Sequence, residues 1–181
     1  VDTAMGSDEM VYTVLDVTEK PFRLVKMVAA KGNSKSPQMH LNDFLDLCDA
    51  YRGDNNKLRI MLETWNGESA RFYLDLPPHI QIITKCYGSW QPEKRRSENK
   101  NEPRPKNQSI KKADILLSLR KLLSGRELKI PENNADLTQQ LSIYKEDDGN
   151  IPTDRVLSLA LASWLASETS TFQASIKWIS W

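Results

Sequence analysis

Four residues could supply imidazole or thiol chemistry, the two histidines and the two cysteines: His40, Cys48, His79 and Cys86. A tetrahedral zinc site accepts two imidazoles and two thiolates. Their spacing does not match compact zinc motifs, and an isolated histidine beside a helix or strand edge is more often structural than catalytic. We therefore expect two buried thiols and two surface histidines, with no bound metal and no cofactor.

A second candidate for chemistry is the acidic turn Glu146, Asp147, Asp148 and Gly149. Crowded carboxylates can bind a divalent cation or act as an acid and a base. A solvated turn uses the same residues, so a metal-dependent hydrolase is the third-ranked hypothesis. The sequence contains no Gly-rich phosphate loop, GxSxG or HExxH motif, which favours binding over catalysis.

The strongest functional signal is the segment QPEKRRSENKNEPRPKNQSIKK, residues 91–112. It holds eight basic residues against three glutamates, a net charge of +5, which leaves −4 for the rest of a chain whose total is +1. Such cations bind phosphate groups by releasing counterions, and they equally attract an anionic membrane surface. The candidate binding residues are Lys94, Arg95, Arg96, Lys100, Arg104, Lys106, Lys111 and Lys112.

The same segment has two other properties. Its three prolines and polar composition cannot build a core, which predicts a flexible loop. KRR followed by KK after a spacer is also typical of a bipartite nuclear import signal, which an import receptor would read. Three tryptophans, Trp65, Trp90 and Trp181, are candidate partner contacts, because exposed tryptophan is enriched at interfaces.

Strands and a hairpin are predicted in the first half of the chain. Residues 10–17 and 22–30 are rich in β-branched and aromatic residues, and a helix follows from Asn42 to Gly53. Residues 58–77 fit a hairpin with a three-residue bulged loop, Trp65 to Gly67, which would pair Leu58 with Leu74, Ile60 with Phe72 and Leu62 with Ala70. One more strand is expected at 79–87.

Helices dominate the second half. A leucine stripe predicts a helix from Ser109 to Ser124, ended by Gly125, and a last helix is expected over 152–165. Residues 141–145 suggest a short strand, and alternating apolar residues predict a closing strand at 172–178. These elements predict an α+β fold with a mostly antiparallel sheet and three main helices.

Composition also bears on domain organisation and location. We interpret residues 1–7 as a cloning remnant, 8–90 as a strand-rich part, 91–112 as a flexible basic loop, and 113–181 as a helical part whose terminal strand completes the same domain. Residues 156–166 form the longest apolar run, which is too short to span a bilayer. Two cysteines without a CxxC pair favour a reducing, intracellular compartment.

Several stretches resemble the core of rhabdovirus matrix proteins: LVKMVAAKG (24–32), HLNDFLDLCDAYRGD (40–54), the hydrophobic run after it, and IYKEDDG (143–149). The family's release motifs PPxY and PTAP are absent, and a leucine-rich helix at 113–124 stands where the family is mainly extended. The resemblance implies a non-enzymatic α+β protein that self-associates and bridges a nucleocapsid to an anionic membrane.

The first hypothesis is therefore a matrix-like structural protein that contacts nucleic acid or nucleoprotein and an anionic surface through the basic segment. The alternative is a nuclear nucleic-acid-binding accessory factor whose import signal is the same segment. Both place the protein in the cytoplasm or nucleus of a host cell, and the first also in a virion.

Overall fold

A computed structural model describes residues 9–31, 34–51, 58–63, 85–87, 106–107, 111–144 and 153–177. Within them lie four helices and two three-stranded sheets, so the predicted α+β class is confirmed. The chain divides into two compact units, which are described separately: unit 1 comprises Val1–Gly32 with Lys111–Trp181, and unit 2 comprises Asn33–Ile110. No helix of the described residues is long and apolar enough to cross a bilayer.

The sheet of unit 1 has the strand order β1, β2, β6. The two predicted strands are confirmed as β1 (Glu9–Asp16) and β2 (Phe22–Lys31), which pair antiparallel, with a bulge between Val14 and Leu15. β6 (Leu128–Lys129) joins β2 in parallel, next to a hydrogen bond of 2.8 Å from the Phe22 N–H to the Glu127 carbonyl. The sheet is therefore mixed, because this short third strand, which the sequence pattern did not predict, runs parallel.

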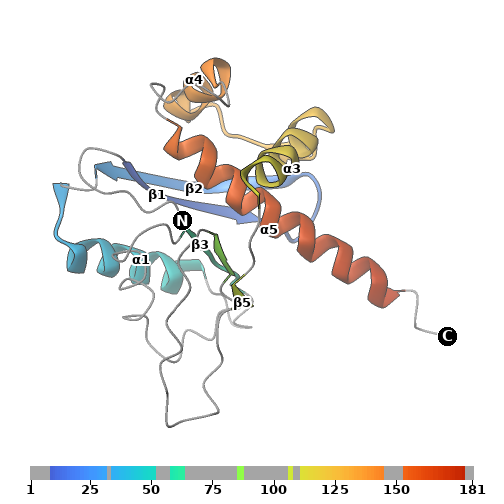
Figure 1. Ribbon diagram of the computed structural model, residues 1–181, viewed down its shortest axis with the longest axis horizontal. Helices are drawn as coiled ribbons and strands as arrows, with labels where there is room; N and C mark the ends of the chain where they lie inside the picture. Colours follow the sequence, from blue (N-terminus) through green and yellow to red (C-terminus); the bar gives the residue numbers. More distant parts are fainter. Residues whose placement is uncertain are drawn as a thin grey trace, which may run out of the picture. The chain divides into compact units, whose positions relative to one another are not determined.

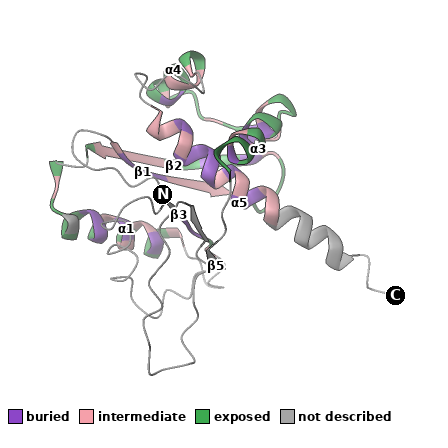
Figure 2. Ribbon diagram, in the orientation of Figure 1, coloured by how far each residue is buried: buried purple, intermediate pink, exposed green. Residues whose placement is uncertain are grey.

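Three helices complete unit 1: α3 (Lys112–Ser124), α4 (Ala135–Ile143) and α5 (Asp154–Lys177). α5 contacts β1, α3 and α4, and so forms the centre of the unit (Figure 1). Each helix buries one apolar face, which is purple in Figure 2. The buried apolar residues are Ile115, Leu119 and Leu122 on α3, Leu137 on α4, and Val156, Leu159, Ala160, Leu161, Leu165 and Ala166 on α5.

α3 is the predicted leucine helix, and its end is stabilised by backbone hydrogen bonds. The Gly125 N–H donates to the Lys121 carbonyl at 2.9 Å, and the Glu127 N–H donates to the Leu122 carbonyl at 2.8 Å. Gly125 is the C-cap in right-handed conformation, and the left-handed residue is Arg126, with φ 55°. A Cβ at Gly125 would lie 3.0 Å from the Lys121 carbonyl oxygen, a contact tighter than ordinary van der Waals packing.

Two predictions for the second half are wrong. Residues 141–143 belong to α4, where the sequence suggested a short strand. Residues 172–177, assigned to the closing strand, belong to α5. Phe172 and Ile176 are spaced by four residues, which fits a helix as well as a strand, and residues 154–177 contain no Gly or Pro that would end the helix.

In unit 2, α1 (Pro37–Tyr51) begins five residues before the predicted cap, Asn42. Ser36 caps it instead, because its Oγ accepts the Met39 N–H at 3.3 Å and Pro37 occupies the first helical position. Its inner face is buried at His40, Leu41, Phe44 and Cys48.

Three short strands form the second sheet, in the order β3 (Met61–Glu63), β4 (Lys85–Tyr87) and β5 (Lys106–Asn107). Both pairings are parallel, so the expectation of a mostly antiparallel sheet is wrong here. β4 lies within the predicted strand 79–87. The loop and second strand of the predicted hairpin fall outside the described residues.

Candidate functional site

Most of the predicted basic site falls outside the described residues: Lys94, Arg95, Arg96, Lys100 and Arg104. Lys106 lies on β5, where it pairs with Lys85 of β4. Lys111 and Lys112 are exposed at the start of α3. Of the basic segment, the structure therefore describes only Lys106–Asn107 on β5 and Lys111–Lys112 at the start of α3.

Lys111 and Lys112 occupy an end of α3 where cations are not favoured. Lys111 is the N-cap, in extended conformation (φ −76°, ψ 140°), and its side chain makes no capping hydrogen bond. The N-terminal end of a helix carries a partial positive charge, so lysines there raise the electrostatic energy slightly, by a few tenths of a kcal/mol at an exposed site. An anion bound nearby would be attracted both by the lysines and by this helix end. Ser109, the predicted cap, lies outside the described residues.

The predicted tryptophan contacts, Trp65, Trp90 and Trp181, and the acidic turn at 146–149 also lie outside the described residues. Among the residues that the structure describes, no three His, Cys, Asp or Glu side chains gather closely enough to hold a metal ion.

His40 and Cys48 both lie on the buried face of α1. His40 is only 3% exposed, so the prediction of a surface histidine is wrong at this position, whereas the prediction of a buried thiol is confirmed at Cys48. Burial, aided by the carboxylate of Asp49, raises the pKa of the Cys48 thiol to about 12. A thiol that stays protonated is a poor nucleophile and a poor metal ligand. His79 lies outside the described residues.

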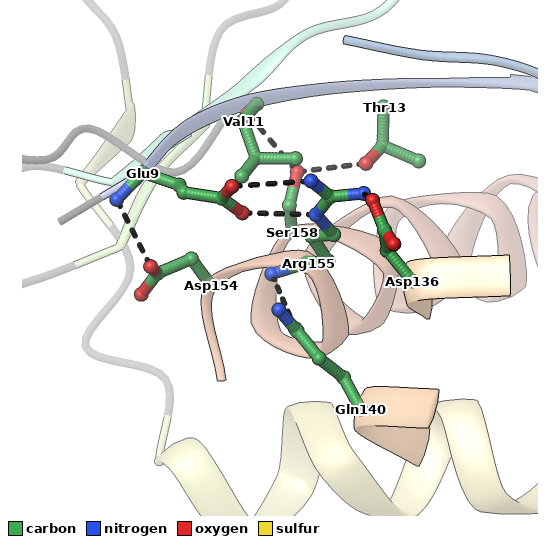
Figure 3. Close-up of polar contacts among 8 residues, drawn as sticks. All are labelled: Glu9, Val11, Thr13, Asp136, Gln140, Asp154, Arg155 and Ser158. Carbon is green, nitrogen blue, oxygen red and sulfur yellow. Dashed lines mark hydrogen bonds and ion pairs between the residues drawn. The ribbon is translucent and has the colours of Figure 1, made fainter. Parts of the chain in front are cut away.

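Sequence reasoning missed a polar cluster in unit 1, here called the Arg155 cluster: Glu9, Asp136, Gln140, Asp154 and Arg155 (Figure 3). Arg155, at the start of α5, donates two hydrogen bonds to the Glu9 carboxylate of β1, at 2.9 and 3.1 Å. It donates a third, at 2.7 Å, to Asp136 of α4. One guanidinium thus joins α5 to the preceding helix, α4, and to β1, which lies 146 positions earlier.

Side chains of the Arg155 cluster also accept hydrogen bonds from two backbone N–H groups. Asp154 Oδ2 accepts the Glu9 N–H at 3.1 Å, and Gln140 Oε1 accepts the Arg155 N–H at 3.2 Å. The second bond caps one of the free N–H groups at the start of α5. Hydrogen bonding to Glu9 raises the pKa of Arg155 above its ordinary value, so the guanidinium stays charged. The cluster is a structural contact, because its carboxylates accept hydrogen bonds from other residues of the same cluster.

A second polar contact lies one turn further along α5. The Ser158 Oγ donates to the Val11 carbonyl at 3.1 Å and lies 2.8 Å from the Thr13 Oγ1 (Figure 3). Because Ser158 gives its single proton to Val11, Thr13 donates the other hydrogen bond. Ser158 and Val11 are fully buried. These bonds fix α5 against β1 where the Arg155 cluster ends.

The sequence held little signal for either contact. Glu9 and Arg155 are separated by 146 positions, and Val11 and Ser158 by 147. Only the acidic residue in the first turn of α5, Asp154, could have suggested a stabilised helix start.

Comparisons with known proteins identify no family. No protein-family model matches the chain, and a search of curated proteins finds no significant match. Inferences about function therefore rest on the chain's own residues.

Proposed function

We propose that the protein is a non-enzymatic, matrix-like interaction protein that binds phosphate-bearing partners through its basic segment and associates with copies of itself. The partners are nucleic acid or nucleoprotein and, secondarily, an anionic membrane surface. The observation that carries the proposal is the charge distribution, with +5 in residues 91–112 and −4 elsewhere. A local cationic field attracts polyanions even when the total charge is close to zero.

Two features of the described residues support this proposal. Lys111 and Lys112 are exposed at the start of α3, and neither forms an ion pair with a described residue. In contrast, the arginine at the centre of the Arg155 cluster is bound by Glu9 and Asp136, which is the arrangement of a structural contact. Lys111 and Lys112 are thus available to a partner in a way that Arg155 is not.

We further propose an intracellular location in a reducing compartment, in the cytoplasm or nucleus of a host cell or in a virion. The free, buried thiol of Cys48 supports this assignment, because unpaired thiols persist where glutathione keeps them reduced. The nuclear accessory factor remains the alternative, since Lys94, Arg95 and Arg96 followed by Lys111 and Lys112 would suit an import receptor.

The test is binding of a fluorescent single-stranded RNA, a duplex DNA and anionic liposomes at several salt concentrations. The variant Lys94→Ala/Arg95→Ala/Arg96→Ala removes three cations of the basic segment. Its matched control, Lys20→Ala/Arg23→Ala/Lys26→Ala, removes three exposed cations from β2 and the turn before it.

We expect the slope of log K against log salt to flatten by roughly two to three units in the first variant and to change little in the control. The preferred polyanion then separates the matrix-like role from the nuclear one. Wild-type protein that binds none of the three ligands at low salt would refute the proposal.

A further inference from the structure

The sheet of unit 1 has two edges, and α5 closes the edge that β1 forms. The Glu9 N–H donates to an Asp154 carboxylate oxygen at 3.1 Å, and the Val11 carbonyl accepts from the Ser158 hydroxyl at 3.1 Å (Figure 3). These backbone groups point away from β2, because their partners lie on α5 rather than on the sheet. A further strand could not pair with β1 here without displacing α5.

The opposite edge of the sheet is only partly covered. β6 pairs with β2 at Phe22 and Arg23, whereas β2 continues to Lys31. Among the residues that the structure describes, no strand pairs with the outer side of β2 after Arg23. The uncovered stretch is called the β2 edge: residues 25–31.

Alternation along the ladder determines which backbone groups face the β2 edge. In an antiparallel pair, residues that exchange hydrogen bonds with the neighbouring strand alternate with residues whose backbone groups point away. Val11 points away from β2, so its register partner, Ala29, points away from β1, and so does Met27 two residues earlier. Within the described part of the chain, the outward N–H and C=O groups of Met27 and Ala29 have no hydrogen-bond partner. Both residues are partly exposed, so these groups are available to a further strand.

We propose that a second copy of this chain pairs antiparallel with the β2 edge through its own β2 edge. This inference rests on the self-association that the proposed function includes, and it assigns a surface to that association. A two-fold axis passes beside Val28, so that Val28 faces Val28 of the second copy and Met27 faces Ala29 of the second copy. Each Met27–Ala29 pair then exchanges both of its N–H···O bonds, and the two sheets become one continuous sheet.

The length of the β2 edge selects this register. Residues that face the edge must lie opposite one another, so the second copy can slide only in steps of two residues. With Val28 on the axis, Lys31 of the second copy lies opposite Val25, and all of residues 25–31 are paired. One step further would place Lys31 of the second copy opposite Arg23, where β6 already lies. The proposed register is therefore the longest that leaves β6 in place.

Charge does not oppose this arrangement. Lysines on an exposed edge strand often prevent further pairing. Here Lys26 lies opposite Ala30 of the second copy, and Lys31 lies opposite Val25, so no like charges are directly opposed. The two copies of Lys26 are offset by four residues, about 13 Å at 3.3 Å per residue, a separation at which salt screens most of their repulsion. At the centre, the two Val28 side chains form a pair of β-branched residues, which suit strands.

Disulfide cross-linking tests the register. In a non-hydrogen-bonded antiparallel pair, the Cα atoms of opposite residues lie about 4.5 Å apart, within the range that a disulfide spans. Val28→Cys should therefore link two copies under mild oxidation, in a Cys86→Ser background whose remaining native thiol, Cys48, is buried. Lys26→Cys is the matched control, because Lys26 is more exposed than Val28 but lies about 13 Å from its counterpart. We expect at least roughly tenfold more linked dimer from Val28→Cys than from Lys26→Cys.

Sedimentation velocity of the full chain tests the hydrogen bonds. Ala29→Pro removes an N–H that faces the β2 edge and leaves the bonds between β1 and β2 intact, and proline is tolerated in an edge strand at such a position. Circular dichroism checks that the variant is folded. We expect the wild-type protein to dimerise reversibly and Ala29→Pro to dimerise roughly 30-fold more weakly, because each copy loses one hydrogen bond across the interface.

The outcomes separate this inference from the proposed function. If the wild-type protein dimerises, but Val28→Cys and Lys26→Cys link equally or folded Ala29→Pro dimerises as the wild type does, the self-association stands and the β2 edge is the wrong surface. If the wild-type protein stays monomeric at every concentration, the inference and the self-association both fail. The salt dependence of RNA binding tests the remaining part of the proposed function independently.

Discussion

Ser158 and Ser163 provide a matched pair on α5. Both side chains are fully buried, and both lie on the same helix of unit 1. Ser158 makes hydrogen bonds to Val11 and Thr13, whereas the Ser163 Oγ has no hydrogen-bond partner within the described residues. The same substitution, Ser to Ala, should therefore change the free energy of unfolding in opposite directions at the two sites.

The magnitudes follow from the contacts. Ser158→Ala removes two hydrogen bonds, about 1 kcal/mol each, and leaves the buried Val11 carbonyl without a partner. The higher helix propensity of alanine returns about 0.5 kcal/mol, so the net loss is about 1.5 to 2 kcal/mol. Ser163→Ala removes a buried, unsatisfied hydroxyl and gains the same propensity, which should stabilise the protein by about 0.5 to 1.5 kcal/mol.

Urea unfolding followed by circular dichroism measures both changes, with differential scanning calorimetry as a check. A change of 1 kcal/mol shifts the melting temperature of a domain of this size by about 2–4 °C, so the two variants should differ by roughly 4–14 °C. Equal destabilisation by both substitutions, or a more stable Ser158→Ala protein, would show that the α5–β1 contact described above is incorrect.

Three further predictions are each checked by a different measurement. Arg155→Met should cost about 2 kcal/mol in urea unfolding because the half-buried Glu9 loses its partner, whereas Asp136→Asn, whose carboxylate is 68% exposed, should cost less than about 0.5 kcal/mol; equal costs would contradict this. In a Cys86→Ser protein, Cys48 should react with a thiol reagent at pH 8 at least about a hundredfold more slowly when folded than in denaturant, because burial raises its pKa to about 12. Wild-type protein should lose more stability than Asp16→Asn as the pH falls below 3.8, because hydrogen bonds from the Thr18 N–H and hydroxyl lower the pKa of Asp16 in the folded state. The stability that a lowered carboxyl pKa contributes is complete above the ordinary pKa of the group and is lost as the pH falls through its folded-state pKa. Parallel pH profiles of the two proteins would refute this role of Asp16.

The parts of the fold that could be predicted are those whose apolar residues repeat at a fixed period. Ile115, Leu119 and Leu122 mark one face of α3, and the β-branched run from Met10 marks β1. α4 was missed because Leu137 is its one fully buried residue, so it presents no stripe. The end of α5 was misread because Phe172 and Ile176 satisfy both the strand and the helix period.

Long-range pairings could not be predicted for a different reason. β6 has two residues, too few to show any periodicity, and it pairs with β2 through Phe22 and Arg23, more than 100 positions earlier in the sequence. The Arg155 cluster joins β1, α4 and α5, and nothing local in Glu9 or Asp136 indicates its partner. Charge, in contrast, is visible in composition alone, which is why the basic segment is the first functional signal in the sequence.

The central claim is that cations of the basic segment bind nucleic acid as polyelectrolyte contacts. The most direct test is the salt dependence of wild-type binding to a single-stranded RNA between 50 and 300 mM salt. At least five phosphate contacts predict a slope of log K against log salt of about −3.5 or steeper, since each contributes about −0.7. A slope between zero and −1, or no measurable binding at 50 mM salt, would contradict the account.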